Sequence, residues 1–210
     1  MLVFVSGYIS AQTINEKQVY EGLRPDPYSL YDFSYDYNTG SFVYSSYDTV
    51  TQKSRVSSNK GNSNEYSYLQ TSDIVYDNSG NYFAVAINTH NDESYTADHY
   101  FLKNGKEILS SSNIQSPILR KDDGIYFVAN VNGKDTRVKY NFAAEKLEYG
   151  KSYDTIFLAA TRVMYGEGEP ATEIGFTKSG KEYYAASKNG KHIFVVGDTE
   201  YGPYDEIIYY

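Results

Sequence analysis

The sequence repeats itself, and this repetition constrains the fold more than any other feature does. The segment Glu148–Ile156 (EYGKSYDTI) returns as Glu200–Ile207 (EYGPYDEI), so the period is roughly fifty residues. A second pattern, in which a polar turn ends in glycine and leads into aromatic residues, occurs four times. Its glycines are Gly40, Gly80, Gly124 and Gly180. Repeats of this length are typical of arrays of small β-modules, because a single module cannot bury its apolar face alone.

The composition supports an all-β array and excludes several kinds of function. The chain has 210 residues, among them 25 Tyr, 10 Phe and 5 Pro, with no Trp and no Cys. Tyrosine suits half-buried sheets, because its ring packs while its hydroxyl stays in water. The absence of cysteine excludes disulfides, thiolate metal sites and cysteine nucleophiles. The net charge of −8 and the scattered Lys and Arg residues argue against nucleic-acid binding, which relies on basic patches.

Short strands separated by glycine turns are predicted within each module. The run Tyr82–Ile87 is apolar throughout, which predicts a strand buried on both faces. A second turn follows as Asn132-Gly133 and as Asn189-Gly190, and Asn-Gly is the strongest short-range signal for a type I′ hairpin. In the second module we assign the same turn to Asn104-Gly105 and interpret Asn88–His99 as an inserted loop. Three or four strands in about 40–56 residues match the content of a β-propeller blade.

We therefore predict an all-β fold, a β-propeller-like array of about four blade modules that forms an incomplete ring. The modules span residues 31–74, 75–118, 119–173 and 174–210, and residues 12–30 form a polar lead-in. Residues 1–11 are interpreted as a truncated secretory signal peptide, which predicts export to the periplasm or the cell exterior. The alternative for this apolar run is an ordinary first strand. No later segment has the ~20 apolar residues of a membrane span.

The order of these signals resembles a known family of repeats. Ser179-Gly180-Lys181, an aromatic strand, Asn189-Gly190-Lys191 and then Gly202–Ile207 resemble the WD-like repeats of TolB-type β-propellers. The resemblance is clearest over 174–210 and extends over 119–156. It implies an exported bacterial propeller that serves as an interaction platform and is often joined to another domain. WG-type repeats share the Tyr-Asp-x-Ile ending, but their shorter period and Trp-Gly signature are missing here.

Four tyrosines are the candidate ligand-binding residues. Tyr95, Tyr100, Tyr165 and Tyr201 lie at or near predicted loops. Exposed tyrosine at the mouth of a propeller can stack against sugars or peptides. The alternative for each of them is packing on the surface of a strand.

One cluster resembles a set of metal ligands. His90 and His99 flank Asp92 and Glu93, and two histidines with a carboxylate are a ligand set that suits zinc. We interpret the segment as a solvated hairpin insertion, so no metal and no cofactor is predicted. The chain also lacks a Gly-x-Ser-x-Gly nucleophile motif, and no catalytic residue is predicted.

The function predicted from the sequence is a non-catalytic binding or scaffold module of an exported bacterial protein. Its loops would recognise a protein or an envelope polysaccharide. The alternatives are a propeller accessory to a hydrolase encoded outside this segment, and a lectin or hydrolase that acts on glycans. An array of this kind exposes strand edges and apolar faces at its ends, so we also expect the isolated chain to self-associate or to be only marginally stable.

Overall fold

The residues that the structure describes form β-strands and the turns between them. The computed structural model describes residues 33–90, 96–157, 159–160, 172–173 and 175–205. No helix occurs among these residues, and hence none that could cross a membrane. The predicted signal peptide (1–11) and lead-in (12–30) lie outside the described residues. The all-β prediction is confirmed.

Four antiparallel sheets follow one another along the chain. The first sheet contains β1 (Ser34–Asp36), β2 (Ser41–Asp48), β3 (Lys53–Ser58) and β4 (Glu65–Tyr66). The second contains β5 (Tyr68–Tyr76), β6 (Tyr82–Thr89), β7 (Ala97–Lys103) and β8 (Lys106–Ser111). The third contains β9 (Ile114–Lys121), β10 (Gly124–Val131), β11 (Lys134–Asn141) and β12 (Lys146–Tyr153). The fourth contains β13 (Thr155–Phe157), β17 (Glu182–Lys188), β18 (Lys191–Val196) and β19 (Thr199–Tyr204), and β16 (Gly175–Phe176) pairs with β17. The short strands β14 (Ala159–Ala160) and β15 (Thr172–Glu173) pair with each other.

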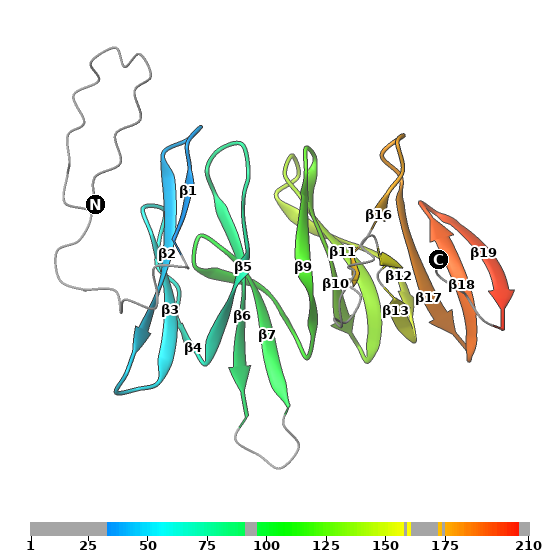
Figure 1. The fold of residues 1–210 in the computed structure, drawn as a ribbon, viewed down its shortest axis with the longest axis horizontal. Helices are drawn as coiled ribbons and strands as arrows, with labels where there is room; N and C mark the ends of the chain where they lie inside the picture. Colours follow the sequence, from blue (N-terminus) through cyan, green and yellow to red (C-terminus); the bar gives the residue numbers. More distant parts are fainter. Residues whose placement is uncertain (1–32, 91–95, 158, 161–171, 174, 206–210) are drawn as a thin grey trace, which may run out of the picture.

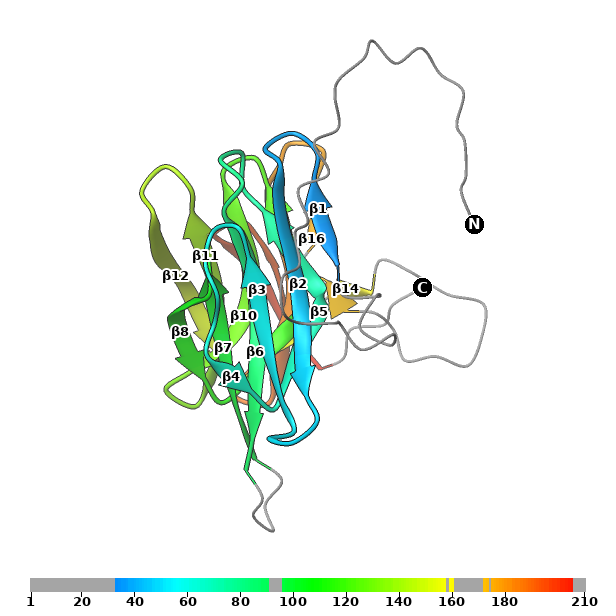
Figure 2. The ribbon, with the colours of Figure 1, turned by 90° about the vertical axis from the view of Figure 1, so that its left-hand side faces the viewer.

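The sheets stack in a row, each against the next (Figure 1). In Figure 2, which looks along the row from the first sheet, the later sheets lie behind it. One hydrophobic cluster fills the space between each pair of neighbours. The first and second sheets share Val43, Val56, Tyr66, Tyr82, Ala84, Ala86 and Leu102, and the third and fourth share Tyr126, Val128, Tyr153, Ile156, Tyr184, Ala186, Ile193 and Val195.

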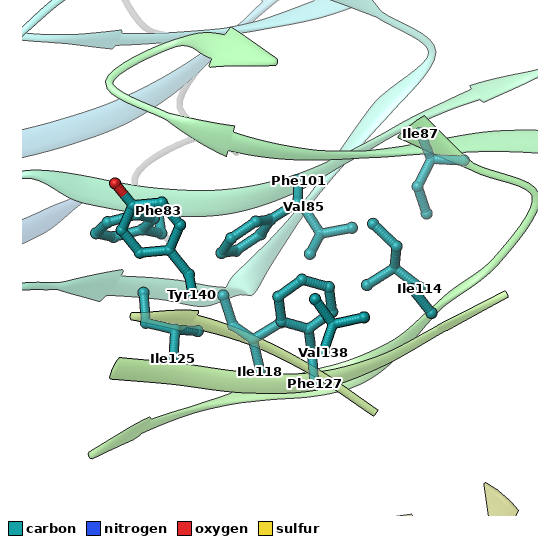
Figure 3. Packing of buried hydrophobic residues seen from close by; sticks show 11 residues of the cluster. Phe83, Val85, Ile87, Phe101, Ile114, Ile118, Ile125, Phe127, Val138 and Tyr140 are labelled. Carbon is teal, nitrogen blue, oxygen red and sulfur yellow. The ribbon is translucent and has the colours of Figure 1, made fainter. Parts of the chain in front are cut away.

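The largest cluster lies between the second and third sheets. Figure 3 shows Phe83, Val85 and Phe101 facing side chains of the third sheet that include Phe127 and Val138. The central strand β6 is buried on both faces from Tyr82 to Ile87, as its unbroken apolar sequence predicts. A strand with neighbouring sheets on both sides has no solvent face, so the usual alternation of polar and apolar residues is absent.

The row is open among the described residues. No strand pairing joins the first sheet to the fourth, and the two lie at opposite ends of the row in Figure 1. β2 and β18 accordingly alternate between buried and partly exposed residues, because only one face of each end sheet has a neighbour.

The sheets are offset from the modules assigned from the sequence. The first three sheets each begin with a strand that directly precedes a glycine turn. β5 therefore belongs to the second sheet, although the sequence division places residues 68–74 in the first module. The interpretation of Asn88–His99 as an inserted loop is wrong, because β6 continues to Thr89 and β7 begins at Ala97. Asn104-Gly105 therefore joins β7 to β8 and is the third hairpin of its sheet. The Asn-Gly pair specifies a kind of turn, and not which hairpin of a sheet carries it.

The Asn-Gly turns have the predicted backbone geometry. Asn104, Asn132 and Asn189 have φ angles of 51°, 55° and 54°, and the glycines that follow them have φ angles of 79°, 79° and 72°. Two successive positive φ angles define a type I′ turn, whose twist matches that of the flanking strands. The predicted hairpins at Asn132-Gly133 and Asn189-Gly190 are confirmed as β10–β11 and β17–β18.

A charged pair joins the third and fourth sheets. Arg137 Nε in β11 lies 2.9 Å from Glu182 Oε2 in β17, and the two side chains are 21% and 13% exposed. Burial raises the pKa of the Glu182 carboxyl, and the positive charges of Arg137 and Lys139 oppose that rise. Burial thus favours the neutral form of the Glu182 carboxyl, and Arg137 stabilises its charged form.

Replacing Arg137 with glutamine should lower the free energy of unfolding at neutral pH by about 2–3 kcal/mol, because Glu182 keeps its charge without a partner. A glutamate with a raised folded-state pKa contributes most to stability below its ordinary pKa, and this contribution declines as pH rises through the raised value. The loss in R137Q should therefore shrink as pH falls through the raised pKa of Glu182 and be smallest below about pH 4.5, the ordinary value for glutamate. Urea denaturation of both proteins at acidic and neutral pH measures this difference. A loss that grows on acidification would contradict the assignment.

Candidate functional site

A groove lies where the first hairpin turns of three sheets meet. These turns, together with that of the fourth sheet, lie along the upper edge of the row in Figure 1. The groove has a volume of about 430 Å³. It is lined by Ser34, Tyr35, Asp36, Tyr37, Asn38, Thr39, Tyr76, Asp77, Asn78 and Arg120. These residues come from the first, second and third sheets, so the groove exists only because the sheets stack.

Local turn chemistry shapes two walls of the groove. The Gly40 amide donates to the Asp36 carbonyl at 2.9 Å, and the Gly80 amide donates to the Asp77 carbonyl at 3.1 Å. Gly80 has a φ of +73°, and a Cβ there would overlap the side chains of Ser41 and Thr39. Glycine is therefore needed at this position both for the turn and for close contact between the first two sheets.

Three tyrosines supply the aromatic surface of the groove. Tyr37 is 89% exposed and Tyr35 is 42% exposed, and their rings meet edge to face with centroids 4.8 Å apart. Tyr76 is half-buried, and its hydroxyl donates to the Ser34 carbonyl at 2.9 Å. This hydrogen bond ties β5 to β1, so the ring of Tyr76 is held in place while Tyr37 projects into solvent.

Arg120 brings a positive charge to the groove from the third sheet. Its Nε donates to the Tyr76 carbonyl at 2.6 Å, and its Nη2 donates to Asn78 Oδ1 at 2.5 Å. The guanidinium group is therefore oriented by the neighbouring sheet, although the side chain is exposed. A planar cation that is already held in place loses little conformational entropy when it binds a ligand.

The two carboxylates of the groove are occupied by their own turns. Asp77 accepts hydrogen bonds from the amides of Ser79 and Asn81 at 2.8 and 2.9 Å and from the Asn81 side chain at 2.7 Å. Asp36 accepts hydrogen bonds from Thr39 Oγ1 and from the Asn38 amide. The bond from Thr39 is the main cause that lowers the pKa of Asp36, and the charge of Arg120 lowers it further. A turn-bound carboxyl with a lowered pKa, as at Asp36, fits a binding surface better than a general acid, which needs a raised pKa.

Two other grooves lack this combination of groups. One, of about 330 Å³, has Tyr47 and Tyr68 with Lys53 but no carboxylate. The other, of about 390 Å³, lies on the fourth sheet and has Lys188, Lys191 and Glu200 but no aromatic ring. The groove between the turns is therefore the candidate site.

The two predicted tyrosines that lie within the described residues, Tyr100 and Tyr201, are outside this groove. Tyr100 is in β7 and packs between the first and second sheets, with its ring 5.3 Å from that of Tyr66. Tyr201 is in β19, is 48% exposed and lies opposite Phe194. Tyr95 and Tyr165 lie outside the described residues. The structure does not bring Tyr100 and Tyr201 together, because they belong to the second and fourth sheets.

The predicted histidine cluster contributes a His–Asp pair to the described structure. His90 Nε2 lies 3.0 Å from Asp98 Oδ2 across the β6–β7 hairpin, and both side chains are exposed. Asp92 and Glu93 lie outside the described residues. Within the described part of the chain, no group of three His, Asp or Glu side chains is arranged to hold a metal ion.

The sequence carries a further signal for the groove in its repeated turns. Tyr-Asp stands directly before two of the glycine turns, as Tyr35-Asp36 before Gly40 and as Tyr76-Asp77 before Gly80. The repeated polar turns mark one edge of a stacked array, because corresponding turns of successive modules lie side by side. Arg120 has no such signal, since its place in the groove depends on where β9 meets β5.

Comparisons of the chain with protein-family models, with curated proteins and with solved structures find no match.

Proposed function

We propose that this chain is a non-catalytic binding module of an exported bacterial protein, built as part of a β-propeller, and that the groove between the turns recognises polysaccharide. One observation carries the proposal. Tyr35, Tyr37 and Tyr76 share an open groove with an oriented Arg120 and with Asn38 and Asn78. Periplasmic or extracellular location follows from the apolar N-terminal run and belongs to the same proposal.

The chemistry of the groove suits a sugar chain. Sugars present flat C–H faces that pack on tyrosine rings, and hydroxyl groups that exchange hydrogen bonds with amides, hydroxyls and guanidinium groups. An elongated ligand can follow the row of turns, because the groove is open and spans three sheets. The sheets themselves act as the scaffold that fixes the spacing of the rings.

The test is binding of the chain to immobilised bacterial envelope polysaccharides, followed by calorimetry with the best binder. Tyr37→Ala should weaken binding about tenfold, because it removes the most exposed stacking surface. Tyr149→Ala is the matched control, since Tyr149 is 53% exposed but lies in β12, at the opposite edge of the third sheet from β9. Equal affinity of the Tyr37 variant and the wild type, or no binding to any polysaccharide, would overturn the proposal.

A further inference from the structure

Each inner sheet of the row contacts the preceding sheet and the following sheet through opposite sides. We call the side of a sheet that faces the next sheet in the chain its forward face, and the opposite side its backward face. The forward face of the second sheet presents Phe83 and Phe101, and the backward face of the third sheet presents Phe127, whose ring lies 4.4 Å from that of Phe101. All three internal interfaces pair a forward face with a backward face.

The forward face of the fourth sheet has the composition of a buried face. Ile193 and Val195 point towards the third sheet, so their neighbours on β18 point the other way. The forward face therefore contains Phe157, Tyr183, Ala185, Phe194, Val196 and Tyr201, which lie opposite one another across β13, β17, β18 and β19. No described sheet covers this face, and Phe157 and Tyr201 are 37% and 48% exposed.

The aromatic positions of β17 and β18 on this face match those of β6 and β7 on the covered forward face of the second sheet. Phe194 lies opposite Ala185 in the fourth sheet, as Phe101 lies opposite Val85 in the second. The rings of Tyr183 and Phe194 are 6.1 Å apart, and those of Phe83 and Phe101 are 5.7 Å apart. Phe101 is fully buried by the third sheet. The fourth sheet thus presents the aromatic pattern that another sheet covers elsewhere in the chain.

The first sheet leaves a backward face without a described neighbour. Phe42 stands two residues after Gly40, as Tyr82 stands two residues after Gly80, and Tyr82 is fully buried against the preceding sheet. The rings of Phe42 and Tyr44 stack with centroids 6.5 Å apart, and Tyr35 lies opposite Phe42. Each chain therefore has one aromatic forward face and one aromatic backward face at opposite ends.

We propose that a second copy of this chain occupies these faces, with the first sheet of one copy stacked on the fourth sheet of the other. In this arrangement the backward face of one copy covers the forward face of the other. The same pairing of faces occurs at all three internal interfaces. A back-to-back arrangement would instead oppose two forward faces, a contact that none of the internal interfaces makes. The contact is heterologous, so it leads either to a closed ring of copies or to a longer row.

The test uses two variants that each disable one face of the full chain. Phe194→Lys places a charge on the forward face, and Phe42→Lys places one on the backward face; both side chains are partly exposed, so the fold should survive. The wild type should gain mass with concentration in sedimentation velocity, whereas each variant alone should keep the mass of one chain. An equimolar mixture of the two variants should form a dimer and grow no further, because only one working contact remains.

Three results would overturn the proposal. They are a wild type that stays a single chain at every concentration, a Phe194→Lys variant that still associates, and a variant mixture that stays monomeric while the wild type associates. Tyr201→Lys repeats the forward-face test at a more exposed position, and thermal melting of each variant separates loss of contact from loss of fold. Tyr149 belongs to neither of the two aromatic faces, so the Tyr149→Ala variant should associate like the wild type. Tyr35 lies beside Phe42 and also lines the groove, whereas Phe194 and Tyr201 belong to the fourth sheet and do not line it. Association of the fourth-sheet variants therefore tests this proposal separately from polysaccharide binding.

Discussion

Replacing Phe101 with alanine should lower the free energy of unfolding by about 3–5 kcal/mol, the usual cost of removing a buried phenylalanine. Phe101 is fully buried in β7, where its ring lies 4.4 Å from Phe127 in the third sheet and 5.7 Å from Phe83 in its own. The substitution leaves a cavity between two sheets whose strands are fixed by their own pairing, so the site cannot easily collapse. Urea denaturation followed by circular dichroism measures the loss.

Tyr68→Ala is the control for Phe101→Ala. Tyr68 is an aromatic residue of the same sheet, but it is 45% exposed, so its loss should cost no more than about 0.5 kcal/mol. If Phe101→Ala and Tyr68→Ala destabilise the protein equally, the contact between the second and third sheets does not carry the stability assigned to it.

The second large effect is expected at Tyr153, the last residue of β12. Tyr153 is 1% exposed, its ring meets that of Tyr184 edge to face at 6.0 Å, and its hydroxyl donates to Glu200 Oε1 at 3.1 Å. Tyr153→Ala should cost about 3–5 kcal/mol, because it removes a buried ring between the third and fourth sheets. Tyr153→Phe should cost only about 1–2 kcal/mol, because it removes the hydroxyl alone.

The pair of Tyr153 variants separates packing from hydrogen bonding. Burial is the main cause that raises the pKa of the Tyr153 hydroxyl, so it remains a hydrogen-bond donor throughout the neutral range. Thermal unfolding of both variants gives the comparison. If the phenylalanine variant loses as much stability as the alanine variant, the bond to Glu200 rather than the ring holds the two sheets together.

A tyrosine hydroxyl makes an equivalent hydrogen bond between sheets at the other end of the row. Tyr66 ends β4, is 1% exposed and donates its hydroxyl to Glu107 Oε1 of the next sheet at 2.7 Å. At the intervening junction Ser111 ends β8, and its hydroxyl donates to the Asn130 carbonyl of the third sheet at 2.7 Å. The last residue of a sheet thus bonds to the following sheet at all three described junctions, with tyrosine at two of them.

Much of the strand content follows from the sequence, because its causes are local. The apolar run Tyr82–Ile87 gives β6, and the Asn-Gly turns give the hairpins of the third and fourth sheets. The first strands of the second and third sheets have no such local signal. β9 carries Pro117 and mixed polarity, and β5 has a register shift between Gln70 and Val75, so neither shows the clear period of a strand.

The candidate site depended on contacts that no local pattern encodes. Tyr37 and Arg120 lie far apart in the sequence and meet in one groove only because three sheets stack with their first turns aligned. Tyr100 illustrates the opposite problem. It stands near a polar segment in the sequence, but its strand continues through that position and places the ring between two sheets.

The order in which the ribosome delivers the chain gives the row of sheets a particular folding problem. The first three sheets are each made of consecutive strands, so each of these sheets can complete its pairing soon after it emerges, without waiting for distant sequence. Its forward face, however, is covered only by residues that have not yet been synthesised. Phe83 and Phe101 remain in water until β9–β12 have been made, and during that interval the nascent chain presents a binding surface for chaperones.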